Sequence, residues 1–171
     1  MKNLIKFAGA ALVAATMLFT TSCTQDLCVK NKITCQNGGT CLDGICTCAA
    51  GYEGDLCATE SRTKFVGTFS GNETCTVGSD TYSITIGNSG DVAKVVVTNL
   101  YNNTPAYVTP VNLNGTKFTA ASVVVSTTPN TVTISDIAGT ISGSSLTVSY
   151  KISSSAVGSA TNACTFTGTK Q

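Results

Sequence analysis

Cysteine is the residue type in this sequence whose spacing points most directly to a chemistry. Of the nine cysteines, six lie between Cys28 and Cys57 in the pattern C-x6-C-x5-C-x4-C-x-C-x8-C. Zinc sites and dithiol redox sites favour CxxC pairs or mixtures of cysteine with histidine, and this chain contains neither a CxxC pair nor a histidine. The pattern therefore indicates disulfide bonds, which so short a segment needs because it cannot bury enough apolar surface to fold alone. Six cysteines allow 15 pairings, and spacing alone does not choose among them.

The composition excludes several kinds of active site. Without histidine, the chain lacks the commonest general base and the nucleophile–histidine relay of many hydrolases. The formal net charge is +1 and no run of basic residues occurs, so we expect no nucleic-acid partner. We also expect no enzymatic activity and no cofactor, because no spacing places two of the carboxylates in one site. The carboxylates include Glu53, Asp55, Glu60, Glu73, Asp80, Asp91 and Asp136.

Residues 1–22 have the features of a secretory signal peptide. Two lysines precede an apolar run at residues 7–19, and small residues follow it. The run is too short to span a bilayer comfortably. Export places the chain in an oxidising compartment, where paired disulfides are the default state of cysteines.

Cys23 directly follows the small residues Thr20-Thr21-Ser22. This arrangement resembles the lipobox of bacterial lipoproteins, which implies a diacylglycerol group on the Cys23 sulfur. Residues 23–27 would then be the lipid anchor and its tether. The non-acidic Thr24 implies sorting to the outer membrane. The alternative is ordinary cleavage after Ser22 and secretion.

Residues 28–57 resemble an epidermal-growth-factor-like (EGF-like) module. The resemblance rests on CQNGGTC, the CxC after it and AAGYEGDLC. It implies three disulfides: Cys28–Cys41, Cys35–Cys46 and Cys48–Cys57. Asp43-Gly44, between Leu42 and Ile45, suits a two-residue type I′ hairpin turn.

Calcium-binding members of the EGF-like family carry acidic or amide residues before their first cysteine. Asp26 is the one candidate ligand here, and a hard cation needs about six or more oxygens. We therefore expect no metal site.

Residues 64–171, which follow a short polar joint at residues 58–63, have the texture of β-strands. Apolar and polar residues alternate, and no segment shows a helical period. Tyr82, Ile84 and Ile86 share one face of DTYSITIG, while Leu146, Val148, Tyr150 and Ile152 share one face of SSLTVSYKIS. We expect an all-β domain of eight to ten short strands, either an antiparallel meander barrel or, alternatively, a β-sandwich.

Cys75 and Cys164 lie near the two ends of this region. Closure of a meander into a barrel would bring its first and last strands together, so we predict a Cys75–Cys164 disulfide. Cys23 is then left unpaired, as lipidation requires.

The sequences KFVGTFSGNETC, KVVVTNLYN, GTISGSSLTVSY and NACTFTGTK resemble small calycin-like or lipocalin-like barrels of bacterial surface lipoproteins. The resemblance implies that residues 64–171 form a calycin-like barrel domain. The expected location is the outer membrane or cell surface of a Gram-negative bacterium.

Three functions fit these expectations. The first is a membrane-anchored, surface-exposed monomer that binds or adheres to an unidentified protein or glycan, with the EGF-like module as a spacer. The second is a small-ligand carrier that uses the barrel interior or mouth; a calcium-binding EGF-like protein is a third, weaker fit. The loop YNNTPAY is the candidate contact surface, through Tyr101, Asn102, Asn103 and Tyr107. A narrow barrel is filled by its own side chains, so we expect five aromatic residues in the core: Phe65, Phe69, Phe118, Tyr150 and Phe166.

Overall fold

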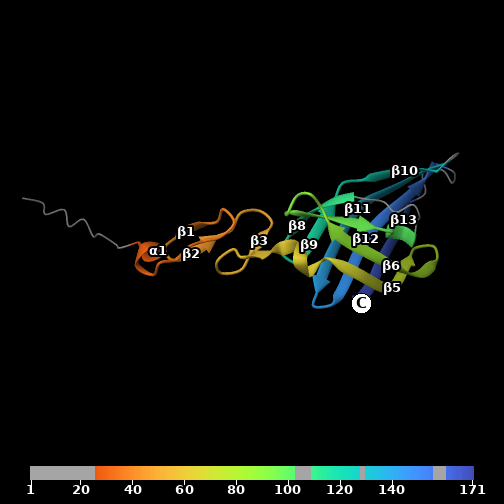
Figure 1. The fold of residues 1–171 in the computed structure, drawn as a ribbon. Helices are drawn as coiled ribbons and strands as arrows, with labels where there is room; N and C mark the ends of the chain where they lie inside the picture. The colour runs from red at the N-terminus through yellow and green to blue at the C-terminus, as the bar shows by residue number, and fades with distance from the viewer. Residues whose placement is uncertain (1–25, 103–108, 128–129, 156–160) are drawn as a thin grey trace, which may run out of the picture.

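The computed structural model describes residues 26–102, 109–127, 130–155 and 161–171. A small disulfide-rich module at residues 26–60, called the N-terminal module below, is followed by a nearly closed antiparallel β-barrel (Figure 1). In the described part of the chain, no helix has the length and apolar character needed to cross a membrane.

Disulfide bonds hold the N-terminal module together. Cys28 is bonded to Cys41, Cys35 to Cys46 and Cys48 to Cys57, which is the pairing that the EGF-like resemblance implies. Cys28 and Cys57 are its buried apolar residues, so cystines take the place of a hydrophobic core. Its elements are α1 (Leu27–Lys30), β1 (Thr40–Leu42), β2 (Ile45–Thr47), β3 (Tyr52–Glu53) and β4 (Thr59–Glu60).

The turn between β1 and β2 has the geometry that the sequence predicts. Asp43 and Gly44 have φ angles of 50° and 86°, and Leu42 pairs with Ile45 on either side of them. Positive φ at both central residues is the requirement of a type I′ turn, which matches the twist of the two strands.

Nine strands form the sheet of the C-terminal domain. Their order is β10-β11-β12-β13-β5-β6-β7-β8-β9, and β9 also pairs with β11, which closes a ring of eight antiparallel strands. The barrel prediction is therefore confirmed over the β-sandwich alternative. The strands are β5 (Gly67–Cys75), β6 (Ser79–Asn88), β7 (Lys94–Thr98), β8 (Thr109–Asn114), β9 (Lys117–Ala120), β10 (Val123–Thr127), β11 (Asn130–Ser142), β12 (Ser145–Ser154) and β13 (Thr161–Lys170).

Two short strands, β9 and β10, share one edge of the long strand β11. β9 pairs with the second half of β11, at residues 137–140, and β10 pairs with its first half, at residues 130–134. Between these halves β11 contains a bulge, where Asp136 has a φ of 53°. A bulge bends its strand and increases its twist, so β9 and β10 together follow the bend of β11.

Alternate residues of the strands fill the barrel interior. The two faces predicted from alternation on β6 and β12 are buried, and so are the five predicted core aromatics. The Phe118 ring on β9 covers Gly139, its partner on β11, where a Cβ atom would lie 2.0 Å from a ring carbon. Phe118 also meets Phe65 edge-on, with ring centroids 5.8 Å apart. The interior is therefore packed with side chains, as expected for eight strands.

The predicted polar joint is ordered structure. Residues 58–63 contribute β4, which pairs with β3, and most of a 3-10 turn, η1 (Ser61–Lys64). The Lys64 Nζ atom lies 2.6 Å from a carboxylate oxygen of Glu53. The joint is thus tied back onto the N-terminal module.

A glycine of the module packs directly on the barrel. Gly51, with a φ of 88°, contacts Val92 and Ala93 in the loop between β6 and β7, and a Cβ atom on Gly51 would lie 2.8 Å from their backbone. Arg62 donates a hydrogen bond of 2.8 Å to the carbonyl oxygen of Ser89 in the same loop. These contacts fix the module against one end of the barrel, here called the proximal end. The opposite end is called the distal mouth.

Candidate functional site

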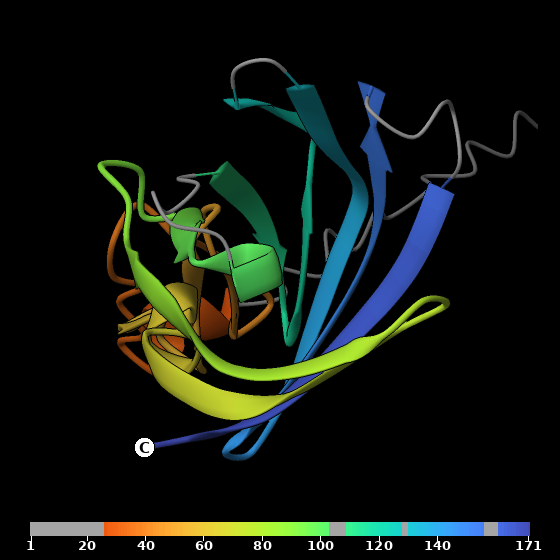
Figure 2. The ribbon, with the colours of Figure 1, turned by 90° about the vertical axis from the view of Figure 1, so that its right-hand side faces the viewer.

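The distal mouth is formed by the turn between β5 and β6 and by the segment that follows β7. Figure 2 looks into this end of the barrel, with the short turn η2 (Leu100–Asn102) inside the ring of strands. β5 begins at Gly67, next to the proximal end, and ends at the mouth with Cys75. The last residues of β5 and the first residues of β6 therefore point their inward side chains into the mouth.

The predicted Cys75–Cys164 disulfide is present at the mouth. The two residues are direct partners in the pairing of β5 with β13, and their Cα atoms are 4.0 Å apart. The bond therefore crosses the seam at which the first and last strands of the barrel meet.

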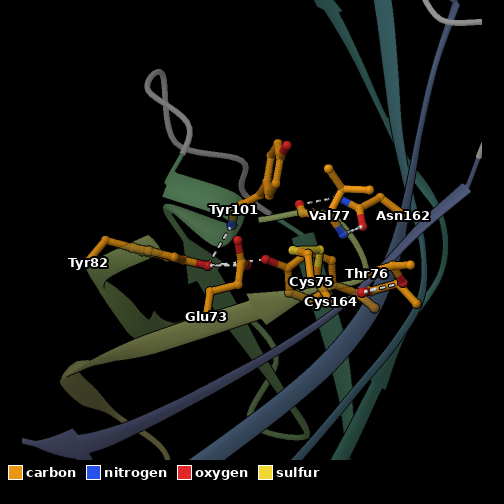
Figure 3. The surroundings of a disulfide bond; sticks show 10 residues. Glu73, Cys75, Thr76, Val77, Tyr82, Tyr101, Asn162 and Cys164 are labelled. Atoms are coloured by element: carbon orange, nitrogen blue, oxygen red, sulfur yellow. Dashed lines mark hydrogen bonds between the residues drawn. A yellow bond between two sulfur atoms is a disulfide. The ribbon is translucent and has the colours of Figure 1, made fainter. Parts of the chain in front are cut away.

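A chain of polar groups lies beside this disulfide inside the mouth. The Tyr82 hydroxyl group donates a hydrogen bond of 2.7 Å to Oε1 of Glu73 and accepts one of 3.1 Å from the backbone N–H of Tyr101. The Tyr150 hydroxyl group lies 3.1 Å from the same oxygen of Tyr82. Since Tyr82 has one proton to donate, Tyr150 donates to Tyr82 when Glu73 is ionised. Figure 3 shows the bonds of Tyr82 to Glu73 and Tyr101 beside the disulfide.

Burial sets the electrostatics of this chain. Glu73 is only 3% exposed, and its burial raises the pKa of its carboxyl group. The hydrogen bond from Tyr82 acts in the opposite direction, and the negative charge of Asp80 raises the pKa of Glu73 further. Burial also raises the pKa of the Tyr82 phenol, followed in effect by its bond to Glu73. Tyr82 therefore stays protonated and remains a hydrogen-bond donor at physiological pH. Of these two residues, Glu73 is the one whose protonation state can change with pH.

The segment over the mouth has an unusual backbone. Asn99, Tyr101 and Asn102 have φ angles of 63°, 62° and 44°, in the left-handed region that non-glycine residues seldom occupy. For Tyr101 this conformation costs on the order of 1–3 kcal/mol. The N–H of Tyr101 bonds to Tyr82, and Asn102 Nδ2 donates a hydrogen bond of 2.7 Å to Oδ2 of Asp80. Side chains of β6 thus hold the segment in place.

The side chain of Asn99 also ties this segment to β6. Its Nδ2 donates a hydrogen bond of 2.9 Å to the carbonyl oxygen of Ser83, whereas its buried Oδ1 has no hydrogen-bond partner among the described residues. An unpaired buried acceptor costs stability.

A cavity of about 290 Å³ opens between these groups. Glu73, Asp80, Tyr101 and Asn102 line it together with Cys75 and the turn between β5 and β6. In Figure 3 the Tyr101 ring and Val77 stand on either side of the space above the disulfide. The cavity thus offers carboxylates, an aromatic ring and an amide group to a ligand that enters from outside the barrel.

The same place is not a thiolate metal centre. A Glu73 oxygen and the sulfur atoms of Cys75 and Cys164 lie within 4.8 Å of one another, but both sulfurs belong to the disulfide. Thiolates, which are the ligands that metals use, are therefore absent from this group. Asp26, the candidate calcium ligand, instead accepts a hydrogen bond of 2.9 Å from the backbone N–H of Cys28 and caps α1.

The sequence located part of this site. Tyr101 and Asn102 of the predicted contact loop lie at the mouth, whereas Asn103, Tyr107 and the predicted lipid site Cys23 lie outside the described residues. Sequence reasoning missed Glu73, Asp80 and Tyr82 as site residues. The available signal was the alternation in FSGNETC, which places Glu73 on the same strand face as Phe69 and Cys75.

Comparison with known families assigns the N-terminal module. The family model described as EGF-like domain matches residues 28–56. The chain therefore contains an EGF-like domain followed by a nearly closed eight-stranded antiparallel barrel. No curated protein matches the chain, and no solved structure matches it.

Proposed function

We propose that this chain is a lipid-anchored protein of the outer membrane of a Gram-negative bacterium, which displays its barrel at the cell surface and binds a partner through the distal mouth. The barrel would be a member of the calycin-like class found in bacterial surface lipoproteins. One observation carries the proposal: the EGF-like domain, which in the sequence follows the predicted lipid site at Cys23, packs on the proximal end of the barrel, opposite the mouth (Figure 1). An anchor at Cys23 would therefore point the mouth away from the membrane.

The joint between the two domains supports a role of the EGF-like domain as a rigid spacer. Gly51 packs on the backbone of Val92 and Ala93, and the ion pair between Lys64 and Glu53 braces the same joint. A flexible linker would let the barrel fold back on the membrane, whereas this packed joint would hold it outward.

The apolar residues at the tip of the EGF-like domain support the same orientation. Leu27, Val29, Leu42 and Ile45 are exposed, and Leu27 contacts Gly44 in the turn between Leu42 and Ile45. Four residues separate Cys23 from Cys28, a reach of roughly 14 Å. The lipid on Cys23 would thus bring this apolar tip to the membrane surface.

The packed interior favours recognition at the mouth over carriage inside the barrel. Phe65, Phe69, Phe118 and Phe166 are fully buried and fill the space that an interior ligand would need. The mouth, by contrast, presents a cavity with polar groups that can orient a ligand.

The proposal is tested in a Gram-negative host that processes lipoproteins. We expect mass spectrometry to find a mature N-terminus at Cys23 carrying a diacylglycerol thioether and a further acyl chain, and we expect the variant Cys23→Ser to lack both. Protease added to intact cells should release barrel fragments. An unmodified Cys23, or cleavage only after lysis, would overturn the corresponding part of the proposal.

A further inference from the structure

The distal mouth contains a carboxylate that no basic side chain of the described residues neutralises. Glu73 is 3% exposed, and among the described residues its side chain accepts one hydrogen bond, from Tyr82. Within the described residues, the ion pairs join Arg62 to Glu60, Lys64 to Glu53, Lys94 to Asp91 and Lys151 to Asp136, and none includes Glu73 or Asp80. A buried carboxylate without a basic partner is costly to keep ionised.

The neighbouring strand adds a second negative charge in place of a positive one. Glu73 on β5 is the direct partner of Asp80 on β6, so both side chains point to the same face of the sheet. Like charges at directly opposite positions of two antiparallel strands destabilise the pair. Both residues line the cavity beneath Tyr101 and Asn102. A local arrangement that lowers stability in this way is typical of a binding site.

We infer that the distal mouth binds an organic cation: an ammonium or guanidinium group carried by a lysine or arginine of a partner protein, or by a free amine. This inference rests on the proposed role of the mouth as the recognition surface. The Glu73 carboxylate is the ionic partner at the base of the cavity, and Asp80 is the second one. The Tyr101 ring at the side of the cavity provides a face for a cation–π contact.

The lining favours an organic cation over a calcium ion. Calcium binds six to eight oxygen atoms, whereas two carboxylates, those of Glu73 and Asp80, line this cavity among the described residues, beside Tyr101, Val77 and Cys75. Ammonium and guanidinium groups need fewer oxygens, because their hydrogen atoms donate to carboxylates while their carbon atoms contact apolar walls. A cavity of about 290 Å³ is large enough for the end of one such side chain.

The test is a chemical-shift titration of the mature protein by NMR, read at the backbone amides of Val77, Tyr101 and Asn102. The probes are Nα-acetyl-arginine methylamide, Nα-acetyl-lysine methylamide and 1,4-diaminobutane. The citrulline analogue of the arginine probe has nearly the same shape without the charge, and calcium chloride serves as the metal probe. The blocked amino acids represent a partner protein and the diamine represents a free amine, so binding of either supports the cation site.

We expect at least one cationic probe to shift these amides, the citrulline analogue to shift them at least tenfold more weakly, and Glu73→Gln to weaken binding at least tenfold. Asp43→Asn is the matched control, because it removes one negative charge at the exposed turn of the EGF-like domain and should leave the titration unchanged. Equal binding of citrulline, undiminished binding to Glu73→Gln, or shifts with calcium alone would overturn the inference. The titration does not depend on the lipid, so loss of anchoring at Cys23 would overturn the proposed display and leave this result intact.

Discussion

The hydroxyl oxygen of Tyr82 lies 2.7 Å from Oε1 of Glu73, so a phenol holds the carboxylate inside the barrel. Burial raises the pKa of Glu73 above its ordinary value of 4.5, with the charge of Asp80 adding to the effect. The folded state therefore binds the Glu73 proton more tightly than the unfolded state does. The stability that this preference contributes is fully present below about pH 4.5 and is lost as the pH rises through the folded-state pKa.

The variant Glu73→Gln should accordingly be more stable than the parent protein at pH 7. An uncharged amide avoids the cost of the buried charge and can still accept the hydrogen bond from Tyr82. We expect urea denaturation to show this gain at pH 7 and to show it disappearing below about pH 4.5. The titratable groups that face Glu73 are Asp80, Tyr82 and Tyr150.

The variant Tyr82→Phe should be less stable than the parent protein at pH 7. It removes the donor that stabilises the ionised carboxylate, and we expect it to lower the free energy of unfolding at pH 7 by about 1–3 kcal/mol. If Glu73→Gln were less stable than the parent at pH 7, or if its effect did not change with pH, the assignment of Glu73 as an uncompensated buried charge would be wrong.

The Cys75–Cys164 disulfide should stabilise the barrel because it restricts the unfolded chain to a closed loop. The two cysteines are 89 residues apart in sequence, and the chain-entropy model gives an upper value of about 4–5 kcal/mol for a loop of that length. We expect the double variant Cys75→Ala/Cys164→Ala to lower the free energy of unfolding of the barrel by up to this amount in denaturant titrations. Because the strands themselves still pair, the barrel should remain folded.

A neighbouring pair of residues supplies the control for this double variant. Thr74 and Thr165 are exposed direct partners in the same pairing of β5 with β13. Replacing both by alanine should cost less than about 1 kcal/mol, because cross-strand side-chain pairs contribute little. Equal losses for the two double variants would show that the disulfide adds nothing beyond its side-chain contacts.

Much of this fold could be predicted because the relevant signals are local. Strict alternation on β6 and β12 marked the buried faces, and Asp43-Gly44 marked a two-residue turn. The leftover cysteines, Cys75 and Cys164, fixed how the meander closes, because closure puts the first strand beside the last. The three pairings in the EGF-like domain required the family resemblance, since spacing alone left 15 possibilities.

The polar part of the site could not be predicted in the same way. Glu73 is one of nine acidic residues scattered along the sequence, and it becomes a site residue only through the register that sets it opposite Asp80 and beneath η2. Tyr82 and Tyr150 meet across the barrel although 68 residues separate them in sequence. The break between β9 and β10 likewise depends on the bulge at Asp136 in the partner strand. These contacts depend on tertiary packing between distant segments, which cannot be predicted from the local sequence of one segment.

The joint between the domains should depend on one glycine. Gly51→Ala places a Cβ atom 2.8 Å from the backbone of Val92 and Ala93, so the domains would have to separate. Gly54→Ala is the matched control: it has a similar φ of 91°, but its nearest neighbour would be 3.8 Å away. We expect faster proteolysis at residues 58–63 and a broader range of domain orientations in small-angle X-ray scattering for Gly51→Ala alone. Equal behaviour of the two variants would contradict a rigid joint.

The exposed apolar tip of the EGF-like domain should contribute to membrane contact even without the lipid. Leu42 and Ile45 are 72% and 73% exposed on either side of one turn, so their replacement by threonine should hardly affect folding. Inserting one such side chain into the lipid interface contributes up to about 1.5–3 kcal/mol, roughly a tenfold effect on affinity for each residue when insertion is partial.

We therefore expect Leu42→Thr/Ile45→Thr to weaken the sedimentation of the unlipidated protein, Thr24–Gln171, with phosphatidylethanolamine–phosphatidylglycerol vesicles by more than tenfold. Val124→Thr is the control, because Val124 is also an exposed apolar residue, at 63%, but lies on β10 of the barrel. It should leave vesicle binding unchanged, since the barrel would face away from the membrane. An equal effect of Val124→Thr, or vesicle binding that does not respond to the tip variant, would show that the EGF-like tip is not the membrane-facing end.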